Sequence, residues 1–227
     1  AANAAVRRFL VGSEWMRREL ATNGMPAERI EIVPPIPEAL TAVEAVPPSE
    51  APEVLFVGQV IRGKGVDLLL RALARVPQPW HATIVGTGNH LEACQSLARK
   101  LGIAEHVRFA GWVRHGALTP LYADAALTVV PSRWPEPFGM VGIEAMARGR
   151  PVVGFAVGGI PDWLEHEVTG LLVPEADTGA LGAAIHRLLA DPPLRARLGE
   201  AAARRIRERF QPQRYLAQLT RILETVA

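Results

Sequence analysis

The residues best suited to chemistry lie in one string, residues 131–147, between a short apolar run and a helical pattern. It carries two carboxylates, Glu136 and Glu144, eight positions apart. A helix that begins near Gly139 leaves the N–H groups of its first turn without helical partners, which suits an anion. One carboxylate would then face a sugar and the other a ribose diol, with phosphate groups between them. The plainer interpretation is an exposed Glu136 and a Glu144 that only favours the helix dipole.

A second string, residues 58–65, places three glycines and the cations Arg62 and Lys64 between a predicted strand and a helix. Glycine allows the backbone to approach an anion, and a lysine offers a point charge to phosphate. The spacing is not that of a Walker A loop. A glycine-rich turn with two exposed cations is the alternative. Glycine pairs at 86–88 and 158–159 also follow predicted strands, and ordinary tight turns explain them equally well.

These strings need a scaffold, and the chain alternates strand and helix patterns from about residue 53. The strands are apolar throughout, which is typical of a parallel sheet covered on both faces. We therefore predict an α/β fold with a doubly wound, Rossmann-like parallel sheet, whose ligands bind at the carboxyl ends of the strands. The predicted strands are 54–57, 81–85, 107–109, 126–130, 152–155 and 171–173, and the predicted helices are 66–73, 91–101, 118–122, 140–148 and 178–189.

The ends of the chain differ from this main domain. We predict the main domain over residues 53–190 and C-terminal helices over 191–227. Residues 1–36 contain a strand–helix pair that cannot bury its own apolar faces, so it must lean on the main domain or on something absent. Residues 37–52 are rich in proline, which predicts a stiff connection. The chain starts with Ala1, so either its start was processed or it is a piece of a longer protein.

Composition narrows the class of protein. The 227 residues are 49% hydrophobic, and 25 basic against 23 acidic side chains leave a net charge of +2, which argues against nucleic-acid binding. A single cysteine, Cys94, excludes a disulfide scaffold, and no apolar run is long enough to span a membrane. The histidine spacing shows no metal site. The arginine-rich helix predicted over 195–214 has an apolar stripe and a solvated face; attraction to an anionic membrane is the alternative.

The order of these strings resembles the retaining GT-B glycosyltransferases, in particular glycosyltransferase family 4, also called glycosyl transferase group 1. The resemblance rests first on the E-x7-E string from Glu136 to Glu144 and its continuation to Val153. It covers about residues 53–210, and its supporting strings are 56–65, 84–88, 107–113, 130–132, 158–162 and 170–174.

The resemblance implies a C-terminal domain that binds a nucleotide-sugar donor. Lys64 would hold the diphosphate and Glu136 the transferred sugar, and these two are the expected catalytic residues. One position departs from the family: Gln59 stands where the family usually has an arginine, and Arg62 is a candidate to compensate. The expected substrate-binding residues are Gln59, Arg62, Val113, Phe138, Gly139, Met140, Val141 and Glu144.

The implied reaction transfers a hexose-type sugar from a UDP-, GDP- or ADP-sugar to an unidentified acceptor, with retention of configuration and without a metal or other cofactor. Residues 1–36 would end an N-terminal GT-B domain that carries the acceptor site. We expect a cytoplasmic protein, or one held peripherally at the inner membrane face. Three alternatives stay open: a non-catalytic nucleotide- or sugar-binding module, an NAD-dependent oxidoreductase and a GT-B-fold sugar epimerase.

Overall fold

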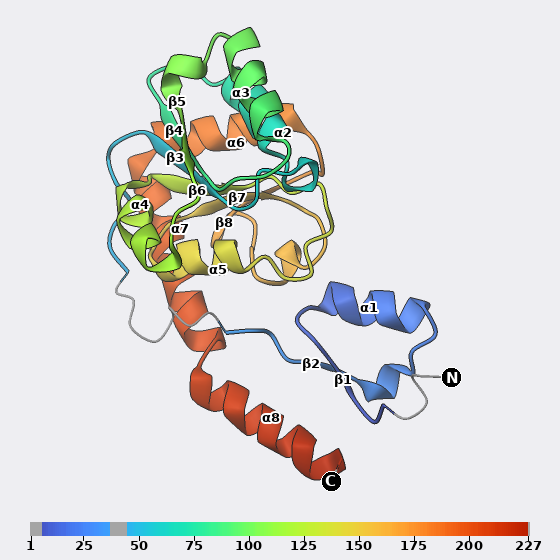
Figure 1. Cartoon of the computed structure of the whole chain (residues 1–227). Coiled ribbons are helices and arrows are strands. Elements are labelled where there is room, and N and C mark those ends of the chain that lie inside the picture. Colours follow the sequence, from blue (N-terminus) through green and yellow to red (C-terminus); the bar gives the residue numbers. More distant parts are fainter. Residues whose placement is uncertain (1–5, 37–44, 227) are drawn as a thin grey trace.

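The structure, a computed structural model, describes residues 6–36 and 45–226 (Figure 1). Its main body is a six-stranded parallel sheet in the order β5-β4-β3-β6-β7-β8. From β3 the chain steps outward through β4 to β5 and then returns to place β6 on the other side of β3. This is the doubly wound sheet that the alternating pattern predicts. Its strands are β3 (Glu53–Val57), β4 (His81–Val85), β5 (Val107–Gly111), β6 (Leu127–Val130), β7 (Val152–Phe155) and β8 (Gly170–Val173).

Helices cover both faces of this sheet (Figure 1). On one face α2 packs against both α3 and α6, and on the other α5 packs against α7 and β6. The helices of the main body are α2 (Val66–Leu73), α3 (Leu91–Lys100), α4 (Leu118–Asp124), α5 (Met140–Ala147), α6 (Thr178–Ala190) and α7 (Pro192–Arg209). Short 3-10 helices at η4 (Arg62–Lys64), η5 (Ala104–His106), η6 (His115–Ala117) and η7 (Ile160–Asp162) connect them.

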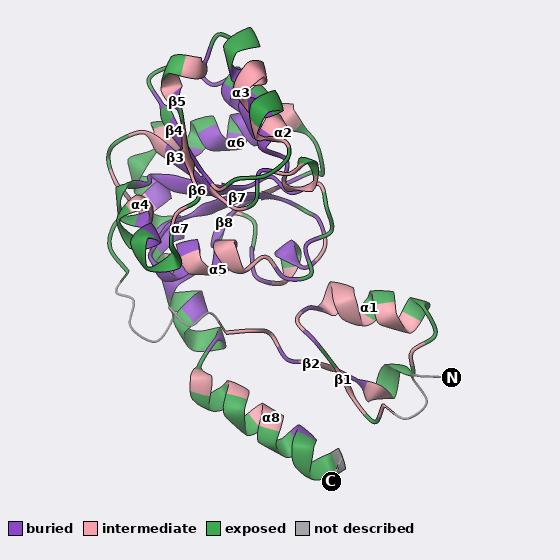
Figure 2. Cartoon of the chain, in the orientation of Figure 1, coloured by how far each residue is buried: buried purple, intermediate pink, exposed green. Residues whose placement is uncertain are grey.

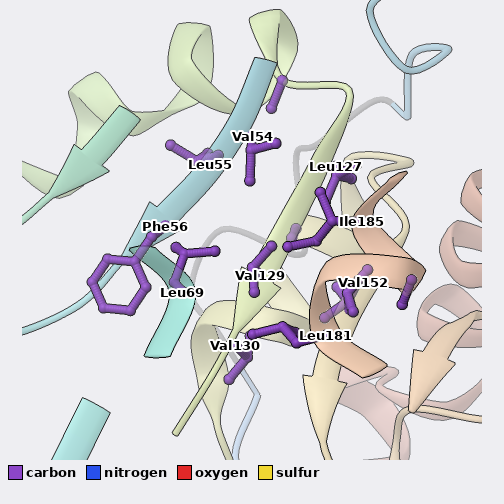
Figure 3. Close-up of a cluster of buried hydrophobic side chains, with 14 of the residues drawn as sticks. Val54, Leu55, Phe56, Leu69, Leu127, Val129, Val130, Val152, Leu181 and Ile185 are labelled. Atoms are coloured by element: carbon purple, nitrogen blue, oxygen red, sulfur yellow. The ribbon is translucent and has the colours of Figure 1, made fainter. Parts of the chain in front are cut away.

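The core lies between the sheet and its helices. Leu69 of α2 and both Leu181 and Ile185 of α6 lie over strand residues such as Val54 and Val129 (Figure 3). All five are at most 1% exposed. Each such side chain contributes about 1.5–3 kcal/mol when it leaves water, so this layer holds the strands in register.

The first described residues form a separate small unit. Strands β1 (Phe9–Val11) and β2 (Ile30–Ile32) pair in parallel, connected through α1 (Glu14–Thr22) and the 3-10 helix η2 (Ala27–Arg29). The last helix, α8 (Pro212–Val226), returns to this unit, where Gln218 Nε2 donates a hydrogen bond to the Ile32 carbonyl at 2.8 Å. Most of α8 is exposed (Figure 2).

The predicted helix over 195–214 is divided in the structure. It ends at Arg209, and α8 starts at Pro212, because proline opens a helix but cannot continue one. The apolar stripe is buried as predicted, but Arg195 is not on the solvated face: it is 3% exposed, and its guanidinium donates to the carbonyls of Leu188 and Ser49.

The first half of the predicted linker, residues 37–44, lies outside the described residues. No helix in the described parts of the chain has the length and apolarity to cross a bilayer.

One glycine controls how the loops after β3 and β6 meet. Gly65 has φ +70°, and a Cβ atom there would lie 1.8 Å from the Pro131 carbonyl oxygen. A backbone oxygen cannot yield as a flexible side chain can. Any other residue at position 65 would therefore push the two loops apart.

We predict that Gly65→Ala lowers the free energy of unfolding by about 3 kcal/mol or more, because backbone strain and overpacking add. Gly102→Ala is the matched control: its φ is +71°, but no atom lies within 4 Å of the added Cβ. The control should cost only about 1 kcal/mol. Urea unfolding measures both, and equal losses would show that the contact with Pro131 is unimportant.

Candidate functional site

The site lies where the strand order reverses. Strands β3 and β6 are neighbours, so the loops that follow their carboxyl ends emerge side by side. These loops are the two strings of cations and carboxylates identified in the sequence, residues 58–65 and 131–139. In open parallel sheets this reversal point is where a crevice forms and ligands bind.

The two loops are hydrogen-bonded to each other. The backbone N–H groups of Arg133 and Trp134 both donate to the Gly63 carbonyl oxygen at 3.0 Å. The Arg133 guanidinium adds an ion pair to Asp67, with 2.7 Å between Nη2 and Oδ2. The positions of Lys64 and Glu136 are therefore set relative to each other by backbone and side-chain contacts.

Glu136 is a buried carboxylate with two partners. It is 6% exposed, and its Oε1 accepts hydrogen bonds from Lys64 Nζ at 2.6 Å and Ser132 Oγ at 2.5 Å. A charge removed from water in this way is stable only when it is paired and hydrogen-bonded. The exposed-glutamate interpretation is therefore wrong. Ser132 is a residue that the sequence analysis missed, although its position after a strand and four residues before Glu136 was a usable signal.

Helix α5 begins directly behind this carboxylate. Its N-cap, Gly139, has φ +88° and provides no side-chain cap. The N–H groups of Met140 and Val141 belong to the first turn and have no acceptor within the helix. Trp163 anchors the loop that precedes α5, since its indole Nε1 donates a hydrogen bond to the Phe138 carbonyl.

A cavity of about 460 Å³ opens at this point. It brings together seven of the predicted site residues, from both loops and from the first turn of α5. Those residues are Gln59, Lys64, Glu136, Phe138, Gly139, Met140 and Val141, and Ser132 joins them. A second cavity of about 330 Å³ adjoins it through Val57, Gly58 and Gln59 and extends to Val113 and Trp112.

Two predicted residues lie outside these cavities. Arg62 lines a different hollow, between α2 and α3, and not the cavity that Lys64 lines. Glu144 lines neither cavity of the crevice; its Oε2 accepts from the Tyr122 hydroxyl at 3.3 Å. Burial, together with the Glu144 charge, raises the pKa of Tyr122 above its usual range, so this hydroxyl stays a proton donor.

The N-terminal unit touches the same loop. Ser13 is fully buried: its Oγ donates to the Pro137 carbonyl at 2.5 Å and accepts from Met16 N as the cap of α1. The Glu14 N–H donates to Asp162 Oδ2 at 2.6 Å. The loop that carries Glu136 is thus in contact with residues that precede the main domain.

Other reactive groups do not extend the site. Cys94 is fully buried in α3, and burial raises the pKa of its thiol to about 11. Within residues 6–36 and 45–226, no group of three or more His, Cys, Asp or Glu side chains is arranged to hold a metal ion.

The fold and the crevice define a class of protein. A six-stranded parallel sheet in this order, followed by C-terminal helices, matches the Rossmann-like C-terminal domain of GT-B glycosyltransferase structures. A family model described as "Glycosyl transferases group 1" matches residues 41–205, and the chain belongs to this family.

Individual relatives agree with this assignment. An uncharacterized glycosyltransferase of Methanocaldococcus jannaschii is 34% identical over 159 residues, covering 69% of this chain and 40% of the relative. The D-inositol 3-phosphate glycosyltransferase of Kineococcus radiotolerans is 33% identical over 232 residues, covering 88% and 53%. The chain therefore spans about half the length of the relatives that it matches.

Solved structures show the same fold. Sucrose-phosphate synthase from Thermosynechococcus elongatus superposes with a TM-score of 0.87 at 32% identity, covering all of this chain and 61% of that one. The Anabaena protein HepE, solved in complex with UDP and glucose, reaches a TM-score of 0.90 at 24% identity, covering 99% and 65%.

We predict that Lys64 and Glu136 are energetically coupled. Lys64→Met leaves a buried carboxylate without its cation and should lower the free energy of unfolding by about 2–3 kcal/mol. Glu136→Gln should cost less, and the double variant should recover about 1–2 kcal/mol relative to the sum of the single losses. Urea unfolding of the four proteins gives this coupling. A value below about 0.5 kcal/mol would be that of an exposed pair and would contradict the burial of Glu136.

We further predict that Ser13→Ala lowers the free energy of unfolding by about 2 kcal/mol, because it removes both a helix cap and the bond to Pro137. Asp177→Ala is the control, since Asp177 caps α6 through Ala180 N and has an exposed side chain. The control should lose about 1 kcal/mol. Thermal unfolding compares the two, and equal losses would mean that the bond to Pro137 adds nothing.

Proposed function

We propose that this chain provides the donor site of a retaining glycosyltransferase, which transfers a hexose-type sugar from a UDP-, GDP- or ADP-sugar. One observation carries the proposal: Lys64 and Glu136 meet at the wall of the crevice cavity, beside the first turn of α5. A cation, a carboxylate and unpaired amides are the groups that a diphosphate and a sugar require. The Anabaena protein with the same fold was solved with UDP and glucose, which supports this ligand class.

The diphosphate is assigned to Lys64 and to the amides of Gly139, Met140 and Val141. When the bond between the anomeric carbon and the phosphate oxygen breaks, its electron pair leaves with the diphosphate. An ammonium group and oriented N–H groups stabilise that charge. A lysine has three N–H donors, so Lys64 can keep its bond to Glu136 while it binds phosphate.

The sugar is assigned to Glu136, whose carboxylate would accept hydrogen bonds from the sugar hydroxyls. Retention would follow if the leaving phosphate guides the acceptor hydroxyl, and takes its proton, on the face from which it departs. Lys64 and the amides provide the electrostatic stabilisation, so we propose that transfer requires no metal.

The nucleoside is assigned to the adjoining cavity. Val113 would meet the base through its backbone, and Gln59, which lines both cavities, would lie near the diphosphate with an amide in place of the family's arginine. Glu144 would accept from the ribose hydroxyls after a change in its contact with Tyr122. Arg62 is not assigned to the donor, because it lines the hollow on the α2–α3 side.

We also propose that a preceding GT-B domain, of which residues 1–36 are the last part, carries the acceptor site. The chain spans about half of its relatives, and Ser13 already contacts the loop of Glu136. The acceptor is a sugar, a lipid-linked sugar or another small molecule. The whole protein would act in the cytoplasm or at the inner membrane face.

Calorimetry of this chain with UDP, GDP, ADP and their sugars tests the proposal. We predict binding of one nucleotide series, and a loss of at least about tenfold in affinity for Lys64→Gln, because a charge-assisted bond to phosphate is removed. Arg75→Gln is the control: it removes an exposed cation near α6, away from the crevice. EDTA should leave the affinity unchanged.

Three results would contradict the proposal. The folded chain could bind no nucleotide, it could bind NAD but no nucleotide sugar, or Lys64→Gln could bind as tightly as Arg75→Gln. Donor turnover by the protein with its preceding domain then separates a transferase from a binding module, and the anomeric configuration of the product tests retention. A nucleotide sugar with one inverted stereocentre as the product, still joined to its nucleotide, would instead indicate the non-hydrolysing epimerase.

A further inference from the structure

A second group of cations lines a hollow of about 370 Å³ between the helices α2 and α3. These helices follow β3 and β4 and lie side by side on one face of the sheet (Figure 1). The hollow shares no lining residue with either cavity of the crevice. It is lined by Arg62, Asp67 and Arg71 on the α2 side and by His90, Ala93, Ser96, Leu97 and Lys100 on the α3 side.

The charges in this hollow are unbalanced. Arg62, Arg71 and Lys100 are exposed cations, and within the described residues none of their side chains makes a hydrogen bond or an ion pair. Asp67 is the carboxylate in the lining, and its Oδ2 is already held by Arg133 at 2.7 Å. Three positive charges therefore line a cavity that contains one carboxylate, already paired with Arg133, and this excess of positive charge raises the local concentration of anions.

Several other guanidinium groups of the chain are satisfied by partners within the protein. Arg150 and Arg195 are buried and bonded to carbonyl oxygens. Arg187 and Arg205 are paired with the carboxylates of Glu167 and Glu165. Within the described residues, Arg204 and Arg207 of α7 also have no side-chain partner, so what distinguishes Arg62, Arg71 and Lys100 is that they line one hollow.

Basic side chains occupy both ends of the hollow. Arg62 and His90 precede the first turns of α2 and α3, whereas Arg71 and Lys100 lie in their last turns. At 1.5 Å per residue these helices are roughly 12 and 15 Å long, so the two ends of the hollow are separated by about that distance. Such spacing suits two or more anionic groups better than one.

We propose that the α2–α3 groove, the hollow lined by Arg62, Arg71, His90 and Lys100, binds a ligand with two or more phosphate groups. Guanidinium forks match phosphate oxygens in bidentate geometry, and a lysine adds a mobile point charge. The Ser96 hydroxyl and the His90 imidazole supply further donors along the wall. The phosphates belong either to a soluble polyphosphate or to an array of phospholipid headgroups.

Two probes distinguish these sources. The first is inorganic tripolyphosphate, measured by calorimetry. The second is sedimentation with vesicles of phosphatidylcholine and phosphatidylglycerol, roughly three to one, against phosphatidylcholine alone. Both are run at about 0.1 M salt, so that distant charges are screened. Binding of either probe or of both supports the groove, and binding of one probe alone identifies the source.

The variants locate the binding. Arg71→Gln/Lys100→Gln should weaken it at least about tenfold, since two charges near the ligand are lost. Arg204→Gln/Arg207→Gln is the matched control: it removes two exposed cations from α7 and leaves the same net charge, so it should stay within about twofold. Lys64→Gln, which tests the donor site, should not change binding to the groove.

The proposal is overturned if the unaltered chain binds neither probe, or if both double variants lose affinity equally, because net charge would then explain the binding. It is also overturned if Lys64→Gln, rather than Arg71→Gln/Lys100→Gln, abolishes tripolyphosphate binding, which would place the probe in the crevice. Circular dichroism confirms folding of each variant. If the double variant fails to fold, Lys100→Gln alone, at the exposed last residue of α3, gives the same test.

Discussion

The buried carboxylate of Glu136 is the constraint on which the rest of the crevice depends. At 6% exposure it needs a cation and a hydroxyl within hydrogen-bond distance, and Lys64 and Ser132 supply them from opposite sides of one boundary between strands. That boundary exists because β6, which follows β4 and β5 in the chain, pairs with β3. The close approach in turn requires Gly65, where any side chain would meet the Pro131 carbonyl.

Two buried arginines bind the segment that precedes β3 to the main body. The guanidinium of Arg150 is fully buried and donates to the carbonyls of Ala125 and Val46, and Arg195 does the same for Ser49. Burial lowers the pKa of Arg150 to about 10, which still leaves it charged at neutral pH. A planar group with five donors can satisfy several carbonyls at once, so the described end of the proline-rich connection is fastened to the main body.

The N-terminal unit is hydrogen-bonded both to the main body beside the crevice and to the last helix. Ser13 and Glu14 contact the main body at Pro137 and Asp162, while α8 crosses back to bond the Ile32 carbonyl. A change in the position of this unit would therefore reach the Glu136 loop through one short hydrogen bond. The unpaired cations of the α2–α3 groove lie on a different surface. One of them, Arg62, belongs to the same 3-10 turn as Lys64.

The sequence by itself determined the layered fold and most of the site. Apolar strands ended by glycine or proline, and helical spacing between them, allow a doubly wound parallel sheet and little else, because strands buried on both faces need helices on both sides. That topology brings Lys64 and Glu136 to one edge of the sheet wherever their side chains point. What only the tertiary structure decided was direction and burial. Arg62 and Lys64 are two residues apart on one turn, yet they face different hollows, and Arg195, in a run of solvated arginines, is buried. Ser132 and Tyr122 acquire their roles from partners that lie close only after folding. These outcomes depend on which atoms meet across the sheet, and residue type and spacing along the chain do not encode such contacts.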